Sequence, residues 1–96
     1  MADKLQLIAK AAGAGSKSLV LPKGTSIFVD GTLTTETITV EYVGLDDSTT
    51  TPAYDEYGQA LVLSVSRTDL VLSATAHVKF TKGVTTNAVG VYAILA

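Results

Sequence analysis

Hydrophobic and polar residues alternate along most of this chain. The clearest stretch is residues 36–42, with the sequence ETITVEY, in which apolar side chains occupy every second position. Alternation with a period of two is typical of a β-strand that buries one of its faces. The same pattern returns in residues 61–65, 76–80 and 89–95. The sequence therefore predicts an all-β chain whose outward strand faces carry many hydroxyl groups.

Turn signals between these stretches set the expected strand boundaries. Segments 22–24 (PKG) and 30–31 (DG) are strong turn signals, because proline fixes φ and glycine accepts a positive φ. A polar loop that contains Pro52 is expected at 45–53, and a hairpin is expected to join the last two strands across 83–87. The predicted strands are 18–21, 25–29, 36–43, 59–66, 70–73, 75–82 and 88–95.

The spacing of these strands indicates the fold class. About six to eight short strands, one roughly every ten residues, are typical of a small antiparallel β-sandwich or barrel. Residues 4–10 also alternate, whereas residues 11–16 contain two glycines and are expected to form a flexible connector. We therefore expect residues 1–17 to be an N-terminal arm or an edge strand, followed by a single β-sandwich domain at 18–96.

The composition limits the class of protein. The chain of 96 residues fits one domain, and a domain of this size buries only about 60–65% of the surface that its unfolded chain exposes. Hydrophobic residues make up 47% of the chain and charged residues 17%. Part of the apolar surface is therefore expected to face another subunit. No apolar run approaches the roughly 18 residues that cross a bilayer, so no membrane span is expected.

The candidate chemistry is sparse. The chain has no cysteine, which removes disulfides, thiolate metal sites and thiol catalysis. Its net charge of -2 argues against binding to nucleic acid, which needs a concentrated basic patch. His77 is the single histidine and falls on the outward phase of a predicted strand, so no Ser-His-Asp arrangement is expected. We expect no enzymatic activity, no cofactor and no metal ion.

Acidic residues gather around one loop. Asp46 and Asp47 lie at its start, and Asp55 and Glu56 lie at its end. Carboxylates in such a loop could hold Ca²⁺, which prefers oxygen ligands. Aspartate next to serine and threonine is also ordinary turn chemistry, because the short side chains bond to nearby backbone groups. The turn is the favoured interpretation.

Two tyrosines, Tyr54 and Tyr57, frame the acidic pair at the end of this loop. Aromatic rings beside carboxylates can stack on a sugar and bond to its hydroxyl groups. The favoured alternative is that one ring covers the end of the sandwich while the other lies at a subunit contact.

Four segments carry a resemblance to a known group of proteins. They are 22–32 (PKGTSIFVDGT), 37–42 (TITVEY), 45–50 (LDDSTT) and 89–93 (VGVYA). Their succession of a glycine-led strand, an alternating strand, an Asp-rich loop and a short C-terminal hairpin resembles small β-sandwich accessory virion proteins of tailed bacteriophages, of the head decoration or cement type. The similarity covers about residues 18–96.

This resemblance implies a structural function. It implies a non-enzymatic protein that assembles in the host cytoplasm, lies on the capsid surface of the virion, and binds the major capsid protein to stabilise the joints between capsid subunits. It also implies a homo-oligomer, with a trimer as one option, and no contact with nucleic acid or membrane. A tail or neck accessory protein and a carbohydrate-binding or adhesion module are the alternatives. The residues expected to bind the partner are Leu5, Leu7, Ile8 and Lys10 on the arm and Tyr54 and Tyr57 on the loop.

Overall fold

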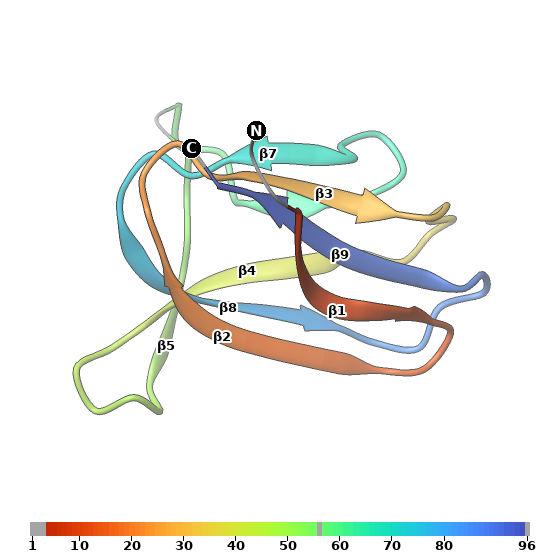
Figure 1. Ribbon diagram of the computed structural model, residues 1–96, viewed down its shortest axis with the longest axis horizontal. Helices are drawn as coiled ribbons and strands as arrows, with labels where there is room; N and C mark the ends of the chain where they lie inside the picture. Colours follow the sequence, from red (N-terminus) through yellow and green to blue (C-terminus); the bar gives the residue numbers. More distant parts are fainter. Residues whose placement is uncertain (1–3, 56, 96) are drawn as a thin grey trace.

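The alternating segments fold as β-strands that form two antiparallel sheets lying face to face (Figure 1). The computed structural model describes residues 4–55 and 57–95. These residues form nine strands and no helix, so none of them belongs to a helix able to span a membrane. The predicted all-β fold is confirmed, and its two-sheet arrangement is that of a small β-sandwich.

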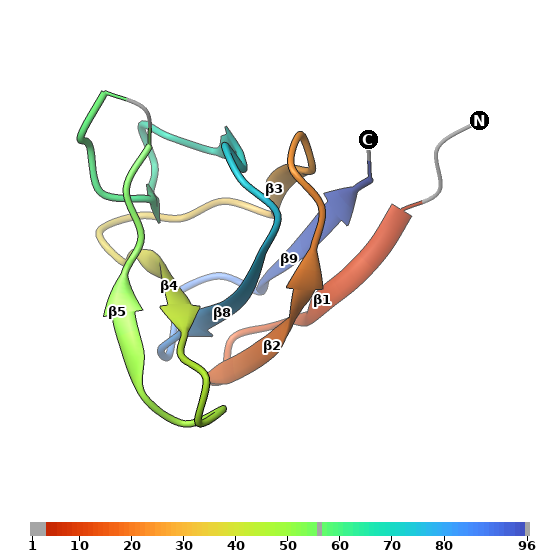
Figure 2. The same ribbon diagram turned by 90° about the vertical axis from the view of Figure 1, so that its left-hand side faces the viewer.

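Each sheet combines strands that are distant in the sequence (Figure 2). The first sheet contains, in spatial order, β1 (Lys4–Ala11), β9 (Val89–Ile94), β3 (Ser26–Asp30) and β7 (Asp69–Val71). The second sheet contains β2 (Gly15–Leu21), β8 (Ala76–Lys82), β4 (Ile38–Val43) and β5 (Thr50–Pro52), and β6 (Val62–Leu63) also pairs with β4.

The core lies between the sheets and follows the period-two alternation. In β4 and β8, Ile38, Val40, Val78 and Phe80 are at most 3% exposed. The residues between them turn to the other face of the sheet, as the pleat requires. The main buried residues of the facing sheet are Ile27, Leu70, Val89, Val91 and Ala93.

The last two strands do not form the predicted hairpin. β8 pairs with β2 and β4 in the second sheet, whereas β9 pairs with β1 and β3 in the first. Both strands alternate, and placing them in facing sheets lets both apolar faces share one core. The connection at 83–88 crosses between the sheets. Buried Thr85 holds it in place by donating its N–H to the Ala12 C=O at 2.8 Å.

Two other predictions were wrong in the second sheet. The predicted polar loop at 45–53 contains β5, a three-residue strand at the edge of the sheet. Proline is tolerated in an edge strand, because N–H groups on its free side have no partner strand. The predicted strand at 59–66 shrinks to the two residues of β6. Its first residues instead belong to a hairpin at 53–61, in which Leu61 donates its N–H to the Ala53 C=O at 2.9 Å.

The N-terminal segment is an edge strand of the first sheet, paired with β9. Leu7 and Ile8, two of the residues expected to bind the partner, are only 6% and 8% exposed and lie in the core, so their side chains are not available to a partner while β1 is paired. These two neighbours are both buried because the register of β1 shifts between Gln6 and Ile8. Residues 1–3 of the predicted arm lie outside the described residues.

Gly90 allows β1 to lie against β9. A Cβ atom added at this glycine would be 2.6 Å from the Ile8 carbonyl oxygen and 2.8 Å from the Lys10 nitrogen. Both contacts are with backbone atoms, which cannot move without displacing the strand. The close approach of the two chains therefore requires glycine at this position.

A buried lysine holds the connection between β1 and β2. Lys82 is 1% exposed, and its Nζ donates hydrogen bonds to the C=O of Ala11, at 2.8 Å, and to the C=O of Gly13. The segment 11–16, predicted to be a flexible connector, is thus tied to β8, and its last residues belong to β2. The lysine thus provides a donor for two carbonyl groups, one at the end of β1 and one in the turn that follows it.

A carboxylate ties two further connections together. One oxygen of Glu36 accepts the N–H and hydroxyl of Thr34 at 3.0 and 2.9 Å, and the other accepts the N–H and hydroxyl of Thr86 at 2.8 Å each. These bonds to the backbone and hydroxyls of Thr34 and Thr86 favour the charged form and lower the pKa of Glu36 to about 2. The segments that follow β3 and β8 are therefore joined through one side chain.

Candidate partner-binding site

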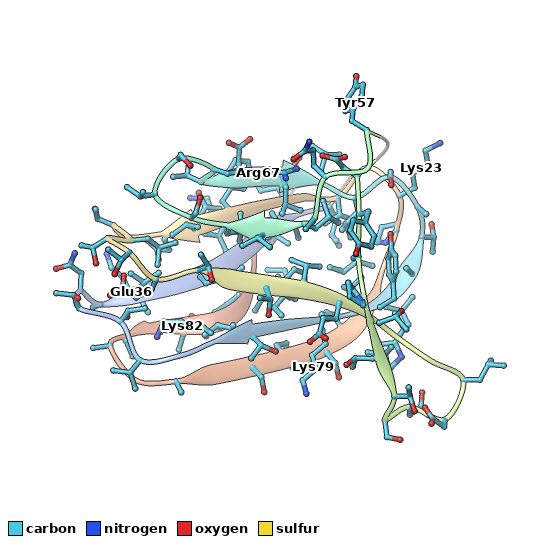
Figure 3. The ribbon with its side chains drawn as sticks, turned by 180° about the vertical axis from the view of Figure 1, so that it is seen from behind. Lys23, Glu36, Tyr57, Arg67, Lys79 and Lys82 are labelled. Atoms are coloured by element: carbon cyan, nitrogen blue, oxygen red, sulfur yellow. The ribbon has the colours of Figure 1, made fainter. Side chains whose placement is uncertain are left out.

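Tyr54 and Tyr57 lie on the 53–61 hairpin, which projects from the sandwich (Figure 3). Tyr54 is 51% exposed and Tyr57 is 83% exposed. Figure 3 shows the ring of Tyr57 pointing away from both sheets. Tyrosine exposed to this extent buries little area within its own domain, although its ring is one of the larger apolar surfaces a side chain can offer a partner. The hairpin is therefore the candidate partner-binding site.

The backbone of this hairpin is well paired. Tyr54 forms a bridge with Ala60, and Asp55 donates its N–H to the Gln59 C=O at 2.8 Å. The Gly58 N–H donates to the Asp55 C=O at 3.1 Å and closes the turn. Gly58 has a φ of +79°, and no atom would contact an added Cβ there, so glycine is required by backbone conformation and not by space.

The Asp55 carboxylate organises the turn. Its Oδ1 accepts the N–H groups of Tyr57 and Gln59, each at 2.9 Å. Its Oδ2 lies 3.3 Å from Nη2 of Arg67, whose Nη1 donates to the Ala60 C=O at 3.1 Å. Arg67 comes from the turn between β6 and β7, so this ion pair links the hairpin to the body of the sandwich. We call these bonds of Asp55 and Arg67 the clamp, and they fix the backbone that carries Tyr57.

The electrostatics of the clamp favour the charged carboxylate. The hydrogen bond from the Gln59 N–H lowers the pKa of Asp55 most. The Tyr57 N–H and the Arg67 guanidinium lower it further, while desolvation raises it. The net effect holds the pKa of Asp55 below its ordinary value of 3.8. The carboxylate is thus ionised and fully engaged within the hairpin at neutral pH.

The other predicted partner-binding residues lie elsewhere. β1 is on the opposite side of the molecule from the 53–61 hairpin (Figure 2). Leu5 remains 37% exposed on that strand. Lys10 lies at the surface, with its Nζ 3.7 Å from Oδ1 of Asp30 and both side chains about half exposed. The structure therefore places Tyr54 and Tyr57 on one hairpin and separates them from the residues of β1.

Arg67 and Gln59 were not predicted to belong to the site. The turn itself had a local signal, because Asp55 and Gly58 occupy the first and fourth positions of a four-residue turn, where aspartate and glycine are favoured. No local signal indicates Arg67, which lies twelve residues after Asp55 and reaches it through the tertiary fold.

The acidic residues at 46–47 form a second, separate turn. Asp46 accepts the Ser48 and Thr49 N–H groups at 3.0 and 2.8 Å and the Thr49 hydroxyl at 2.5 Å. The Thr49 hydroxyl and these N–H groups hold the pKa of Asp46 far below its usual range. Oδ1 of Asp47 lies 3.6 Å from Nδ1 of His77. Across residues 4–55 and 57–95, no three acidic or histidine side chains gather as metal ligands; Glu56 lies outside these residues.

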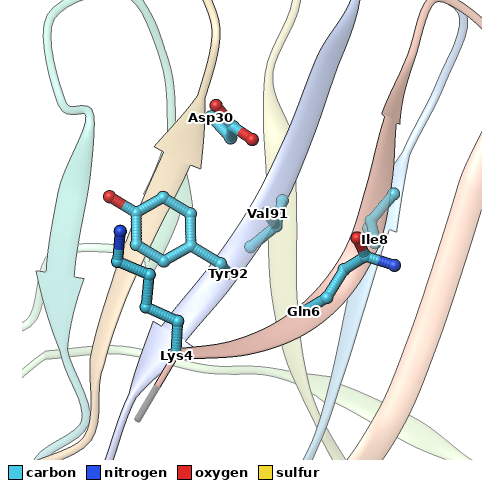
Figure 4. Close-up of a pocket in the computed structure, with 6 residues that line it drawn as sticks. All are labelled: Lys4, Gln6, Ile8, Asp30, Val91 and Tyr92. Atoms are coloured by element: carbon cyan, nitrogen blue, oxygen red, sulfur yellow. The ribbon is translucent and has the colours of Figure 1, made fainter. Parts of the chain in front are cut away.

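A shallow groove of about 310 Å³ opens on the outer face of the first sheet (Figure 4). Tyr92 lines this groove, but its ring is already in contact with the protein. Phe28 from β3 stacks on it, with ring centroids 5.2 Å apart, and Nζ of Lys4 from β1 lies 5.8 Å from the ring centroid. The groove therefore offers no free aromatic surface comparable with that of Tyr57. It is lined by Lys4, Gln6, Ile8, Asp30, Val91 and Tyr92.

The fold and the site thus define a small β-sandwich domain that presents an exposed tyrosine on a clamped hairpin. Comparisons with protein-family models, with curated proteins and with solved structures found no match to this chain.

Proposed function

We propose that this protein is a non-enzymatic structural component of a bacteriophage virion, which binds the surface of the head and stabilises the joints between capsid subunits. The observation that carries the proposal is the 53–61 hairpin, in which Asp55 accepts the backbone N–H of Tyr57 and pairs with Arg67, while the side chain of Tyr57 is 83% exposed. The resemblance of residues 18–96 to decoration proteins supplies the kind of partner, a shell of major capsid protein.

A clamped, exposed tyrosine suits a protein interface. Tyrosine is enriched among the residues that contribute most to binding, where its ring fills a pocket on the partner. A loop that is ordered before binding loses less conformational entropy when it docks. The hydrogen bonds of Asp55 provide that order within the free domain. Tyr57 is thus expected to enter an apolar pocket of the shell.

Further apolar side chains enlarge the surface available to a shell. Leu45 is fully exposed in the turn between β4 and β5, which lies apart from the 53–61 hairpin, at the other end of the segment that contains β5 (Figure 1). Val71 is 54% exposed at the end of β7. A decoration protein acts by adding contacts across joints, so that expansion of the shell must break these contacts as well. Several exposed anchors on a rigid body fit that task.

The carbohydrate-binding alternative is less well supported by the site. A sugar would need free acceptors beside the ring to bond to its hydroxyl groups. Both oxygens of Asp55 already accept bonds from Tyr57, Gln59 and Arg67. The ring of Tyr57 is free, but the carboxylate beside it serves the hairpin.

Co-sedimentation with emptied phage heads that lack this protein tests the proposal. We expect saturable binding with a copy number that matches the symmetry of the shell. Tyr57→Ala should weaken binding by about 30-fold, the loss typical of one interface hot spot. Val84→Ala is the matched control, because Val84 is 75% exposed in a different connection. Absence of binding to any shell, or equal binding by Tyr57→Ala, would reject the proposal, and binding to tails alone would favour a tail component.

A further inference from the structure

The four edge strands of the sandwich differ in how they are protected. Natural β-proteins prevent unwanted strand pairing with short edges, prolines, charges and bulges. β7 and β5 have three residues each, and β5 contains Pro52. β1 is long, but its register against β9 shifts twice and it carries Lys4 and Lys10. These three edges are poor templates for another strand.

β2 has only one of these protections, the single charge of Lys17. All seven of its residues pair with β8 in one unbroken register, from Gly15 with Lys82 to Leu21 with Ala76. The strand contains no proline and one charged residue, Lys17. Its other edge has no strand beside it in the second sheet. Val20 is 65% exposed on this strand. β2 is therefore a regular, nearly uncharged edge that is open to strand addition.

We propose that β2 pairs with β2 of a second copy of this chain, antiparallel and around a twofold axis. The pairing would join the two second sheets into one continuous sheet across the dimer. This inference rests on the edge geometry and is independent of the proposed binding to a phage head.

The sequence of β2 suits pairing with itself. Residues directly opposite each other in an antiparallel pair have their side chains on the same face of the sheet. Paired residues of the two copies must therefore differ by an even number of positions, which places the twofold axis at a residue and not between two residues. An axis at Lys17 would place two lysines opposite each other, which is unfavourable. An axis at Ser18 pairs all seven residues, from Gly15 with Leu21, and sets Lys17 opposite Leu19. An axis at Leu19 would pair only five residues of β2 and place Pro22 in the ladder.

The absence of cysteine from the chain makes this register testable by cross-linking. Residues directly opposite each other in an antiparallel pair have Cα atoms about 4.5–5.5 Å apart, within the range that a disulfide spans. Ser18→Cys should therefore form a covalent dimer on air oxidation. Thr81→Cys is the matched control, since Thr81 is exposed on β8, one strand further from the axis.

A mixing experiment tests the exact pairing. Ser16→Cys and Val20→Cys should each form no covalent dimer when oxidised alone, but a mixture of the two should cross-link, because residue 16 lies opposite residue 20 of the other copy. Sedimentation of the unmodified protein at up to about 1 mM should show an average mass that rises with concentration from the monomer mass towards twice that mass, since this range detects even millimolar association. A monomer or a trimer at these concentrations, or cross-linking of Ser18→Cys no faster than that of Thr81→Cys, would overturn the proposal.

Discussion

The N-terminal strand β1 and the 53–61 hairpin use their large side chains in opposite ways. β1 places Leu7 and Ile8 in the core, where they are less than one tenth exposed. The hairpin leaves Tyr54 and Tyr57 largely in solvent. Both segments lie at the border of the sandwich, and both are paired in antiparallel fashion. They differ in the source of their order.

β1 is ordered by burial, and the hairpin is ordered by polar bonds. β1 gains apolar burial of about 1.5–3 kcal/mol for each large side chain that it places in the core. The hairpin depends on the bonds of the Asp55 carboxylate to Tyr57, Gln59 and Arg67. Disruption of β1 should therefore unfold the whole domain, whereas disruption of the hairpin should leave the sandwich intact. This comparison separates a structural region from a region free to bind.

The largest effect is expected from Gly90→Ala. The added methyl group would overlap the backbone of Ile8 and Lys10 and force β1 away from β9. Loss of the burial of Leu7 and Ile8 should cost about 4 kcal/mol, a large part of the stability of a domain this size. Urea denaturation would measure the change. Gly83→Ala is the control, since no atom lies within 4 Å of a Cβ added there. Equal stability of the two variants would show that β1 is not part of the cooperative core.

A smaller effect is expected from Lys82→Met. Methionine keeps the apolar stem but removes the donors to the C=O groups of Ala11 and Gly13. The turn between β1 and β2 should loosen, at a cost of about 1–3 kcal/mol in the free energy of unfolding. Lys79→Met, on the other face of β8, should change stability less in the same denaturation experiment. If both variants are equally stable, the turn does not depend on the buried lysine.

Asp55→Ala should affect the hairpin and little else. The N–H groups of Tyr57 and Gln59 would lose their acceptor, so their hydrogen exchange should become faster while exchange in β1 stays unchanged. The thermal midpoint of the domain should change little. Asp69→Ala provides a control for loss of an exposed carboxylate. Global destabilisation by Asp55→Ala would contradict the separation of the two regions.

Acid should produce the same local loosening in the unmodified protein, with the smallest effect on the fold. The pKa of Asp55 is lower in the folded hairpin than its ordinary value of 3.8. Its contribution to order is therefore complete above that value and is lost as the pH falls through the lower, folded pKa. The amide NMR signals of Tyr57 and Gln59 should shift in this range, before the signals of β1 lose the chemical-shift dispersion of the folded state. Earlier loss of β1 would show that the core is the more acid-sensitive region.

Part of the fold was predictable because it follows from local pattern. The alternation in residues 36–42 and 76–80 correctly identified strands β4 and β8 and their buried faces. The turns at 22–24 and 30–31 lie at the ends of β2 and β3. The burial of both Leu7 and Ile8 was not predictable, because a register shift interrupts the period of two.

The candidate site was predictable only in part, for a related reason. Tyr54 and Tyr57 could be predicted as partner-binding residues on a loop, and the positions of Asp55 and Gly58 indicate a turn. Arg67 could not be assigned to the site, because its contact with Asp55 depends on where the turn between β6 and β7 lies in the folded domain.

In β4 and β8 the amino-acid pattern specifies which residues form the strand and which face the strand buries, because both depend on neighbours one or two positions away. The choice of partner strand is different. The backbone hydrogen bonds of a ladder are nearly the same for any pair of strands, so they do not favour one neighbour over another. β8 and β9 follow each other in the chain and yet lie in different sheets, since that arrangement lets all the apolar faces share a single core.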